Sequence, residues 1–152
     1  MRALAITYQR DAGPGVFAEA CAAAGVELDQ WFRAETDSAP AEPGSYGAVI
    51  SLGGAMHADH EDTHPWLAPE KALLGELYEA GVPLLGVCLG SQLLAEAAGG
   101  SAVAAREPEI GWVEVEVAPE AADDPVIGPL GPRFEAFSWH SYESRLPAET
   151  SA

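Results

Sequence analysis

The stretch GVPLLGVCLGSQLLAEAAGG, residues 81–100, decides the fold. It contains a short apolar run, Leu84 to Val87, that is typical of a buried strand, and then an amphipathic helix pattern from about Ser91 to Ala98. Cys88 lies between the two, with a glycine two positions away on either side. This pattern predicts a cysteine on a sharp strand-to-helix turn, where small neighbours leave room for a crowded backbone.

Such a turn has a chemical use. The start of a helix presents free N–H groups and a partial positive charge, and both favour the thiolate, which is the reactive form of cysteine. The alternative is that the cysteine is a small buried apolar side chain, which is how we interpret Cys21 in its alanine-rich helix pattern. We therefore expect Cys88 to be the nucleophile and Cys21 to be shielded.

The first 100 residues alternate between apolar runs and helix patterns. In chain order these are a strand at 2–8, a helix at 14–24, strands at 26–32 and 46–52, and a helix at 67–80. The alternation predicts an α/β fold: a doubly wound, mostly parallel sheet with helices on both faces. Because sites in such sheets form beyond the carboxyl ends of the strands, Gly53 and Gly54 are expected close to Cys88.

After Gly100 the pattern changes. Trp112 to Val117 alternates between apolar and polar residues, and Arg133 to Trp139 is strand-like, with prolines and glycines between them. We expect shorter, partly antiparallel strands here, within a single domain that covers residues 1–152.

Composition narrows the classes of partner. The chain has 24 acidic residues against 7 Lys and Arg, a net charge of −17, so nucleic acid and anionic membranes are not expected partners. Two cysteines give no disulfide scaffold, and no secretory signal or membrane span is recognisable. These features predict a cytoplasmic protein, and nothing in the sequence indicates a cofactor.

The segment GVCLGSQLLA closely resembles the nucleophile segment of the class I, triad-type glutamine amidotransferases, in particular stand-alone glutaminases of the GMP synthase type. Other segments resemble that family in the same order: Leu52–Met56, Pro65–Lys71, Glu109–Trp112, and Trp139–His140 followed by Leu146–Pro147. The resemblance runs from Tyr46 to Pro147 and implies a flavodoxin-like fold.

The resemblance implies hydrolysis of the glutamine side-chain amide to glutamate and ammonia, through a γ-glutamyl thioester on Cys88. By the same resemblance, the backbone N–H groups of Gly54 and Leu89 form the oxyanion hole, and Gly53 shapes the turn. Four further residues are implied to bind the substrate: Gln92, Trp139, His140 and Ser141.

Three histidines, His57, His60 and His64, follow the oxyanion glycines among acidic residues. Their spacing matches no zinc pattern, so we expect a solvated loop and no metal site.

The family's catalytic histidine lies in a later segment, usually His-Pro-Glu, with the orienting glutamate two residues further on. Residues 1–152 contain no such segment. The sequence therefore predicts a fragment or a truncated member whose C-terminal part is incomplete, with His140 as the alternative base.

Three hypotheses about the function remain open. The first is a glutaminase that passes ammonia to a synthase partner. The second is a γ-glutamyl hydrolase acting on γ-glutamyl amines or peptides, and the third is a degenerate domain that binds glutamine or a partner protein. A homo-oligomer is compatible with each of them.

Overall fold

The computed structural model describes residues 1–147. Its main body is an α/β unit that contains β1 (Arg2–Thr7), α1 (Val16–Ala23), β2 (Glu27–Phe32), β3 (Ala48–Ser51), α2 (Leu67–Glu79), β4 (Leu84–Gly86) and α3 (Leu89–Ala97). Its four strands form a parallel sheet in the order β2-β1-β3-β4. Short 3-10 turns occupy Pro43–Ser45, Pro119–Ala121 and Gly128–Leu130.

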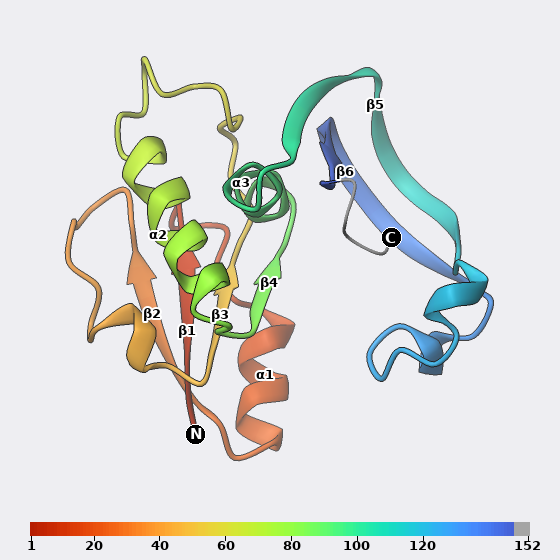
Figure 1. Cartoon of the computed structure of the whole chain (residues 1–152), viewed down its shortest axis with the longest axis horizontal. Helices are drawn as coiled ribbons and strands as arrows, with labels where there is room; N and C mark the ends of the chain where they lie inside the picture. The colour runs from red at the N-terminus through yellow and green to blue at the C-terminus, as the bar shows by residue number, and fades with distance from the viewer. Residues whose placement is uncertain (148–152) are drawn as a thin grey trace.

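Helices cover both faces of this sheet, as predicted (Figure 1). On one face, buried leucines of α2 and α3, such as Leu74 and Leu93, pack against Leu4 and Ile6 of β1. On the other face, Ala5 and Ile50 pack against Phe17 of α1. Alternate residues of β1 thus point to opposite faces, and both are removed from water, which explains the nearly continuous apolar run in the sequence.

The register brings the carboxyl ends of the strands together. Ile6 of β1 lies opposite Ser51 of β3, and Ser51 lies opposite Gly86 of β4. The residues that follow these strands, including Tyr8, Gly53 and Cys88, therefore meet at one edge of the sheet. The expectation that two distant segments converge there is confirmed.

The prediction of short strands in the second half of the chain was wrong. β5 (Ser101–Glu116) and β6 (Arg133–Arg145) are longer than any strand of the main sheet, and they pair with each other in a separate antiparallel ribbon. In Figure 1 this ribbon lies to the side of α3, away from the four-stranded sheet. An irregularity in register between Ala104 and Glu109 accommodates the break in alternation that hid the length of β5.

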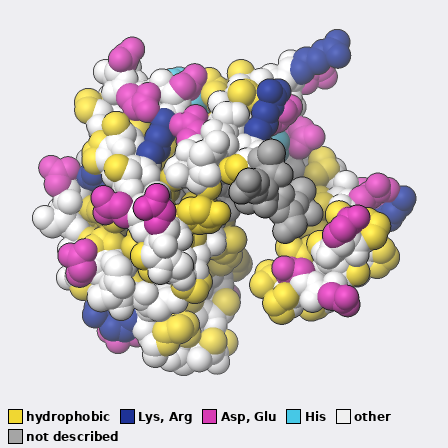
Figure 2. Space-filling view, viewed as in Figure 1, with side chains coloured by type: hydrophobic (Ala, Val, Ile, Leu, Met, Phe, Trp, Pro, Cys, Tyr) yellow, Lys and Arg dark blue, Asp and Glu magenta, His cyan; other side chains and the backbone are white. Residues whose placement is uncertain are grey.

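In residues 1–147, no helix is long and apolar enough to cross a membrane. Figure 2 shows Asp and Glu side chains spread over the visible face, with fewer Lys and Arg among them, in agreement with the net charge of −17.

Candidate functional site

Cys88 occupies a strained turn between β4 and α3. Its φ of 53° and ψ of −114° make it the only residue other than glycine with a positive φ among residues 1–147. Such a conformation costs about 1–3 kcal/mol and persists only when the surroundings enforce it. The predicted cysteine turn is therefore present, although α3 begins at Leu89, two residues earlier than the helix pattern indicated.

Close packing explains the two glycines beside the cysteine. A Cβ atom on Gly90 would lie 2.0 Å from the Ser51 carbonyl oxygen, and one on Gly86 would lie 2.6 Å from the Ser91 Cα. Neither distance is tolerable, so α3 can approach the sheet this closely only with glycine at both positions.

The glycine loop after β3 contacts the cysteine directly. A Cβ on Gly53 would lie 3.3 Å from the Cys88 Cβ, and one on Gly54 would lie 3.1 Å from Leu89 Cδ2. Within residues 1–147, the backbone N–H groups of Gly54 and Leu89 donate no hydrogen bond. The next N–H along the loop, that of Ala55, is occupied by the Gln9 Oε1, 2.7 Å away. Two backbone N–H groups without a hydrogen-bond partner thus lie in the segments next to the thiol: Leu89 follows Cys88, and Gly54 follows Gly53, whose added Cβ would meet Cys88.

A cavity of about 300 Å³ opens at Cys88. It is lined by Gly54, Ala55, Met56, His57, Cys88, Gln92, Pro108, Ile110, Trp139, His140 and Ser141. All four residues expected to bind substrate border this one space, although they come from α3 and from β6. Gly53 and Leu89 are not among its lining residues and lie just behind it.

Two polar atoms at this cavity are buried without a partner in the described part of the chain: Gln92 Oε1 and His140 Nδ1. The other ring nitrogen of His140, Nε2, lies 3.1 Å from Glu109 Oε2. If Nε2–H donates to this carboxylate, Nδ1 carries a lone pair. In this tautomer the cavity offers two unsatisfied acceptors, and each buried polar group without a partner costs about 1–3 kcal/mol.

Trp139 contributes its backbone rather than its ring to the centre of the site. Its carbonyl oxygen accepts a hydrogen bond from Cys88 Sγ at 3.6 Å. The residue itself is 70% exposed and Ile110, which pairs with it across the ribbon, is 65% exposed, so both form an apolar rim.

The expectation of a solvated histidine loop holds only in part, because Asp59 and Asp62 are exposed but the three histidines are half-buried. His57 stacks on Tyr142 of β6 with ring centroids 4.2 Å apart, and Ala58 beside it is fully buried. The Tyr142 hydroxyl also donates to Asp59 Oδ2 at 3.1 Å. The loop is thereby attached to the ribbon, and His57 lines the cysteine cavity. Its position three residues after Gly54 could have indicated this.

No group of three or more His, Cys, Asp or Glu side chains within residues 1–147 is arranged to hold a metal ion.

Exposure does not distinguish the two thiols, since Cys21 and Cys88 are both half-buried. The expected shielding of Cys21 is therefore not complete; what distinguishes Cys88 is its backbone and its neighbours.

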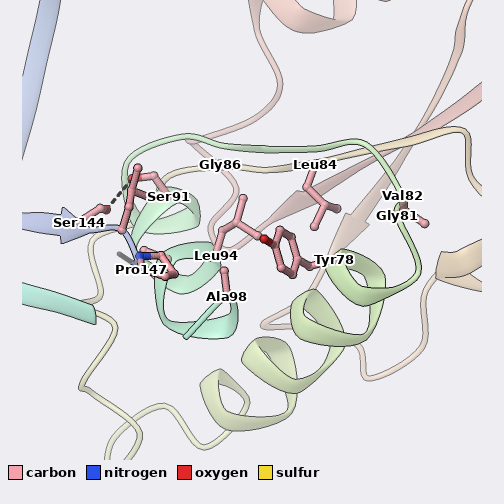
Figure 3. A pocket seen from close by; sticks show the side chains of 12 residues that line it. Tyr78, Gly81, Val82, Leu84, Gly86, Ser91, Leu94, Ala98, Ser144 and Pro147 are labelled. Atoms are coloured by element: carbon pink, nitrogen blue, oxygen red, sulfur yellow. Dashed lines mark hydrogen bonds between the residues drawn. The ribbon is translucent and has the colours of Figure 1, made fainter. Parts of the chain in front are cut away.

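A second cavity, of about 440 Å³, lies beside α3 at the β4 edge of the sheet. Figure 3 shows side chains from α2, α3 and the end of β6 around it, including Tyr78, Leu94 and Ser144. Its lining is largely apolar, and the Ser91 and Ser144 hydroxyls lie 3.3 Å apart at one side. Because no thiol, imidazole or carboxylate belongs to its described lining, the groups suited to catalysis lie at Cys88.

Among known proteins, GMP synthases are similar to this chain in sequence. In Halobacterium salinarum, one of the subunits of GMP synthase [glutamine-hydrolyzing] is 35% identical over 104 residues, which are 68% of this chain and 49% of that protein. The Thermomicrobium roseum GMP synthase [glutamine-hydrolyzing] is 40% identical over 99 residues, 65% of this chain and 17% of that protein.

Solved structures give the same result. A glutamine amidotransferase from Thermotoga maritima matches with a TM-score of 0.90 at 29% identity, covering 99% of this chain and 65% of that one. A glutamine amido transferase from Methylobacillus flagellatus matches with a TM-score of 0.84 at 30% identity, covering 97% and 58%. The chain thus spans less than two thirds of each of these relatives. A family model described as glutamine amidotransferase class-I matches residues 17–151, and the chain belongs to that family.

Proposed function

We propose that the Cys88 cavity hydrolyses the side-chain amide of glutamine to glutamate and ammonia. The observation that carries this proposal is the pair of unoccupied N–H groups, from Gly54 and Leu89, in the two segments that meet at a cysteine held in a strained strand-to-helix turn. Preorganised donors of this kind stabilise the oxyanion of acyl transfer.

In the proposed reaction, the Cys88 thiolate attacks the side-chain amide carbon of glutamine and forms a tetrahedral intermediate. Its oxyanion accepts hydrogen bonds from the Gly54 and Leu89 N–H groups, and Gly53 lets the loop approach the sulfur. The C–N bond then breaks, the nitrogen takes up a proton, and ammonia leaves. Water attacks the γ-glutamyl thioester and releases glutamate and the free thiol.

The unsatisfied acceptors suggest how the substrate is held. Gln92 Oε1 and His140 Nδ1 are suited to the α-ammonium group of glutamine, which carries three N–H donors. We assign Ser141 and the backbone beside Trp139 to the α-carboxylate, since both residues border the same cavity. Binding would remove the cost of two buried atoms without partners.

Proton transfer needs a further group. The imidazoles of His57 and His140 border the cavity, and the second is oriented by Glu109. We assign His140 to substrate binding; as the alternative base it would take the thiol proton itself. Several relatives are separate subunits of GMP synthases, which suggests that a synthase partner receives the ammonia.

One observation favours a γ-glutamyl amide as a second candidate substrate. Ile110 and Trp139 form an exposed apolar rim on the cysteine cavity, and such a rim fits an apolar leaving group better than ammonia. The γ-glutamyl thioester would be the same. Only the amine that leaves would differ.

Affinity labelling tests the proposal on the chain itself. A chloroketone built on the glutamine skeleton should alkylate Cys88 and not Cys21, and free glutamine should slow the reaction. Peptide mass mapping identifies the modified thiol, with Cys88→Ser and Cys21→Ser as matched variants. Preferential labelling of Cys21, or no protection by glutamine, would contradict the assignment.

Measurements of turnover distinguish the three hypotheses about the function. Ammonia release from glutamine supports a glutaminase, and faster amine release from a γ-glutamyl anilide supports the second candidate. Glutamine protection without any turnover indicates a domain that only binds. If His140 binds substrate, His140→Ala weakens the protection by glutamine; if it is the base, this variant keeps the protection and loses turnover.

A further inference from the structure

A buried polar network lies beneath the glycine loop, and the proposed chemistry does not use it. Glu70 of α2 is fully buried, and Tyr8, the residue after β1, is 2% exposed. The Tyr8 hydroxyl lies 3.1 Å from Glu70 Oε1, to which it donates, and 2.6 Å from the Ser51 hydroxyl. Arg33 Nε donates to Glu70 Oε2 at 3.0 Å.

This network is expensive for the fold. Burial raises the pKa of the Glu70 carboxyl, although the hydrogen bond from Tyr8 and the nearby Arg33 act in the opposite direction. A buried ion pair is often no more stabilising than apolar side chains of the same volume. Stability alone therefore does not account for a carboxylate, a guanidinium and a phenol at this depth.

Its location indicates another role. A Cβ on Gly54 would lie 3.3 Å from the Tyr8 Cβ, so Tyr8 forms the floor of the glycine loop. The Tyr8 ring also stacks on Trp66 at 5.1 Å, which fixes it from the side. Through its hydroxyl, Tyr8 holds Ser51, whose carbonyl oxygen accepts the Val87 N–H at 2.9 Å, immediately before Cys88.

The neighbouring residue holds the loop from its outer side. Gln9 Oε1 accepts the Ala55 N–H at 2.7 Å, and the Gln9 amide nitrogen donates to Asp11 Oδ1 at 2.9 Å, which fixes the orientation of the amide. Gly54 thus lies between two residues that follow β1: Tyr8 beneath it, and Gln9 bonded to the next residue.

We propose that Tyr8, anchored by Glu70, and Gln9 are positioning residues that hold the Gly54 N–H where the oxyanion forms. This role rests on the proposed function of Cys88. A displacement of about 1 Å in a catalytic group can cost on the order of a hundredfold in rate, so a rigid support of the loop has a direct kinetic effect.

The test compares two reagents on the same thiol. The glutamine-type chloroketone places its ketone oxygen where the amide oxygen would lie, and therefore needs the oxyanion donors. Iodoacetamide alkylates a thiolate by direct displacement and does not need them. The ratio of the two rate constants at Cys88 measures the oxyanion site independently of the nucleophile.

Tyr8→Phe keeps the stacked ring and removes the hydroxyl, and Gln9→Met keeps the length of the side chain and removes the acceptor. We expect each to lower the chloroketone to iodoacetamide ratio about tenfold or more, with the iodoacetamide rate changed less than about twofold. Tyr46→Phe is the matched control, since Tyr46 is a buried tyrosine that donates to a carboxylate, Asp29, at the other end of the sheet.

A ratio unchanged in both folded variants, or lowered equally in Tyr46→Phe, would overturn the positioning role. Failure of the proposed function has a different signature. In that case the wild-type chain already shows no preference of the chloroketone for Cys88 over Cys21, and the positioning role fails with it.

Discussion

At the scale of single residues, Cys88 is distinguished by geometry rather than by exposure. Both thiols are half-buried, but only Cys88 adopts a positive φ and has a glycine loop against its Cβ. The neighbouring Gly54 and Leu89 N–H groups donate no hydrogen bond, and the proposed acyl chemistry at Cys88 depends on them, whereas Cys21 lies within α1.

The Gly54 N–H can be tested by a small displacement. In Gly54→Ala the new Cβ would lie 3.1 Å from Leu89 Cδ2 and 3.3 Å from the Tyr8 Cβ. Because Leu89 Cδ2 is the end of a flexible side chain, the variant should fold with the loop shifted by a few tenths of an ångström. We expect chloroketone labelling of Cys88 to slow about tenfold to a hundredfold, since complete loss of one oxyanion donor costs about 3 kcal/mol, or about 150-fold, and the shifted loop weakens that donor only in part.

Mass spectrometry of the Cys88 peptide in samples quenched at successive times gives the rate of alkylation by the chloroketone. The rate with iodoacetamide serves as the reference. Gly44→Ala is the matched glycine control, because nothing lies within 4 Å of the added methyl group. A Gly54→Ala chain that labels at the wild-type rate would place the oxyanion donors elsewhere.

At the scale of elements, the sequence predicted what periodicity and turn chemistry encode. The turn at Cys88 and the elements through α3 were recognisable because apolar runs and glycines mark each boundary. β5 and β6 were underestimated because Glu107, Pro108 and Gly111 interrupt the alternation, while the ribbon absorbs them at an irregular register and at a glycine with φ of 135°.

The site was predicted in part for the same reason. The rule that strand ends converge placed the glycine loop near Cys88, and it applies equally to Tyr8 and Gln9 after β1. Their role was not visible because it depends on a buried carboxylate, Glu70, contributed by a helix far along the chain. Likewise, His57 and Tyr142 lie in segments that are far apart in the sequence, and no sequence pattern predicts the contact between them.

The packing of α3 on β3 gives a prediction at this scale. A methyl group on Gly90 would lie 2.0 Å from the Ser51 carbonyl oxygen, a backbone atom that cannot rotate away. Gly90→Ala should therefore lower the free energy of unfolding by about 3 kcal/mol, the upper end of the usual cost of overpacking. Urea denaturation measures it, with Gly44→Ala again as the neutral control. Equal stability of the two variants would contradict the close approach of α3 to the sheet.

At the scale of the whole molecule, charge is the dominant feature. With 24 acidic and 7 basic residues, one-to-one pairing of every cation would still leave 17 carboxylates unpaired. Arg10 and Arg133 lie next to acidic side chains, and these pairs are exposed enough to contribute little. Repulsion among the remaining carboxylates is stronger in the compact state than in the extended chain, so it opposes folding.

Salt should therefore stabilise this protein. Raising NaCl from about 0.01 M to about 0.15 M shortens the screening length from about 30 Å to about 8 Å, which removes most of the repulsion between distant carboxylates. We expect the free energy of unfolding to rise by on the order of 1 kcal/mol, or Tm by about 2–4 °C for a chain of this size.

The gain in stability should be steepest below about 0.2 M NaCl and then level off, because further screening acts only on near neighbours. Thermal unfolding followed by circular dichroism over a NaCl series provides the curve. A Tm that rises in proportion to salt up to molar concentrations would instead indicate exclusion of the salt from the protein surface, and a flat curve would mean that the acidic groups are already far enough apart not to interact.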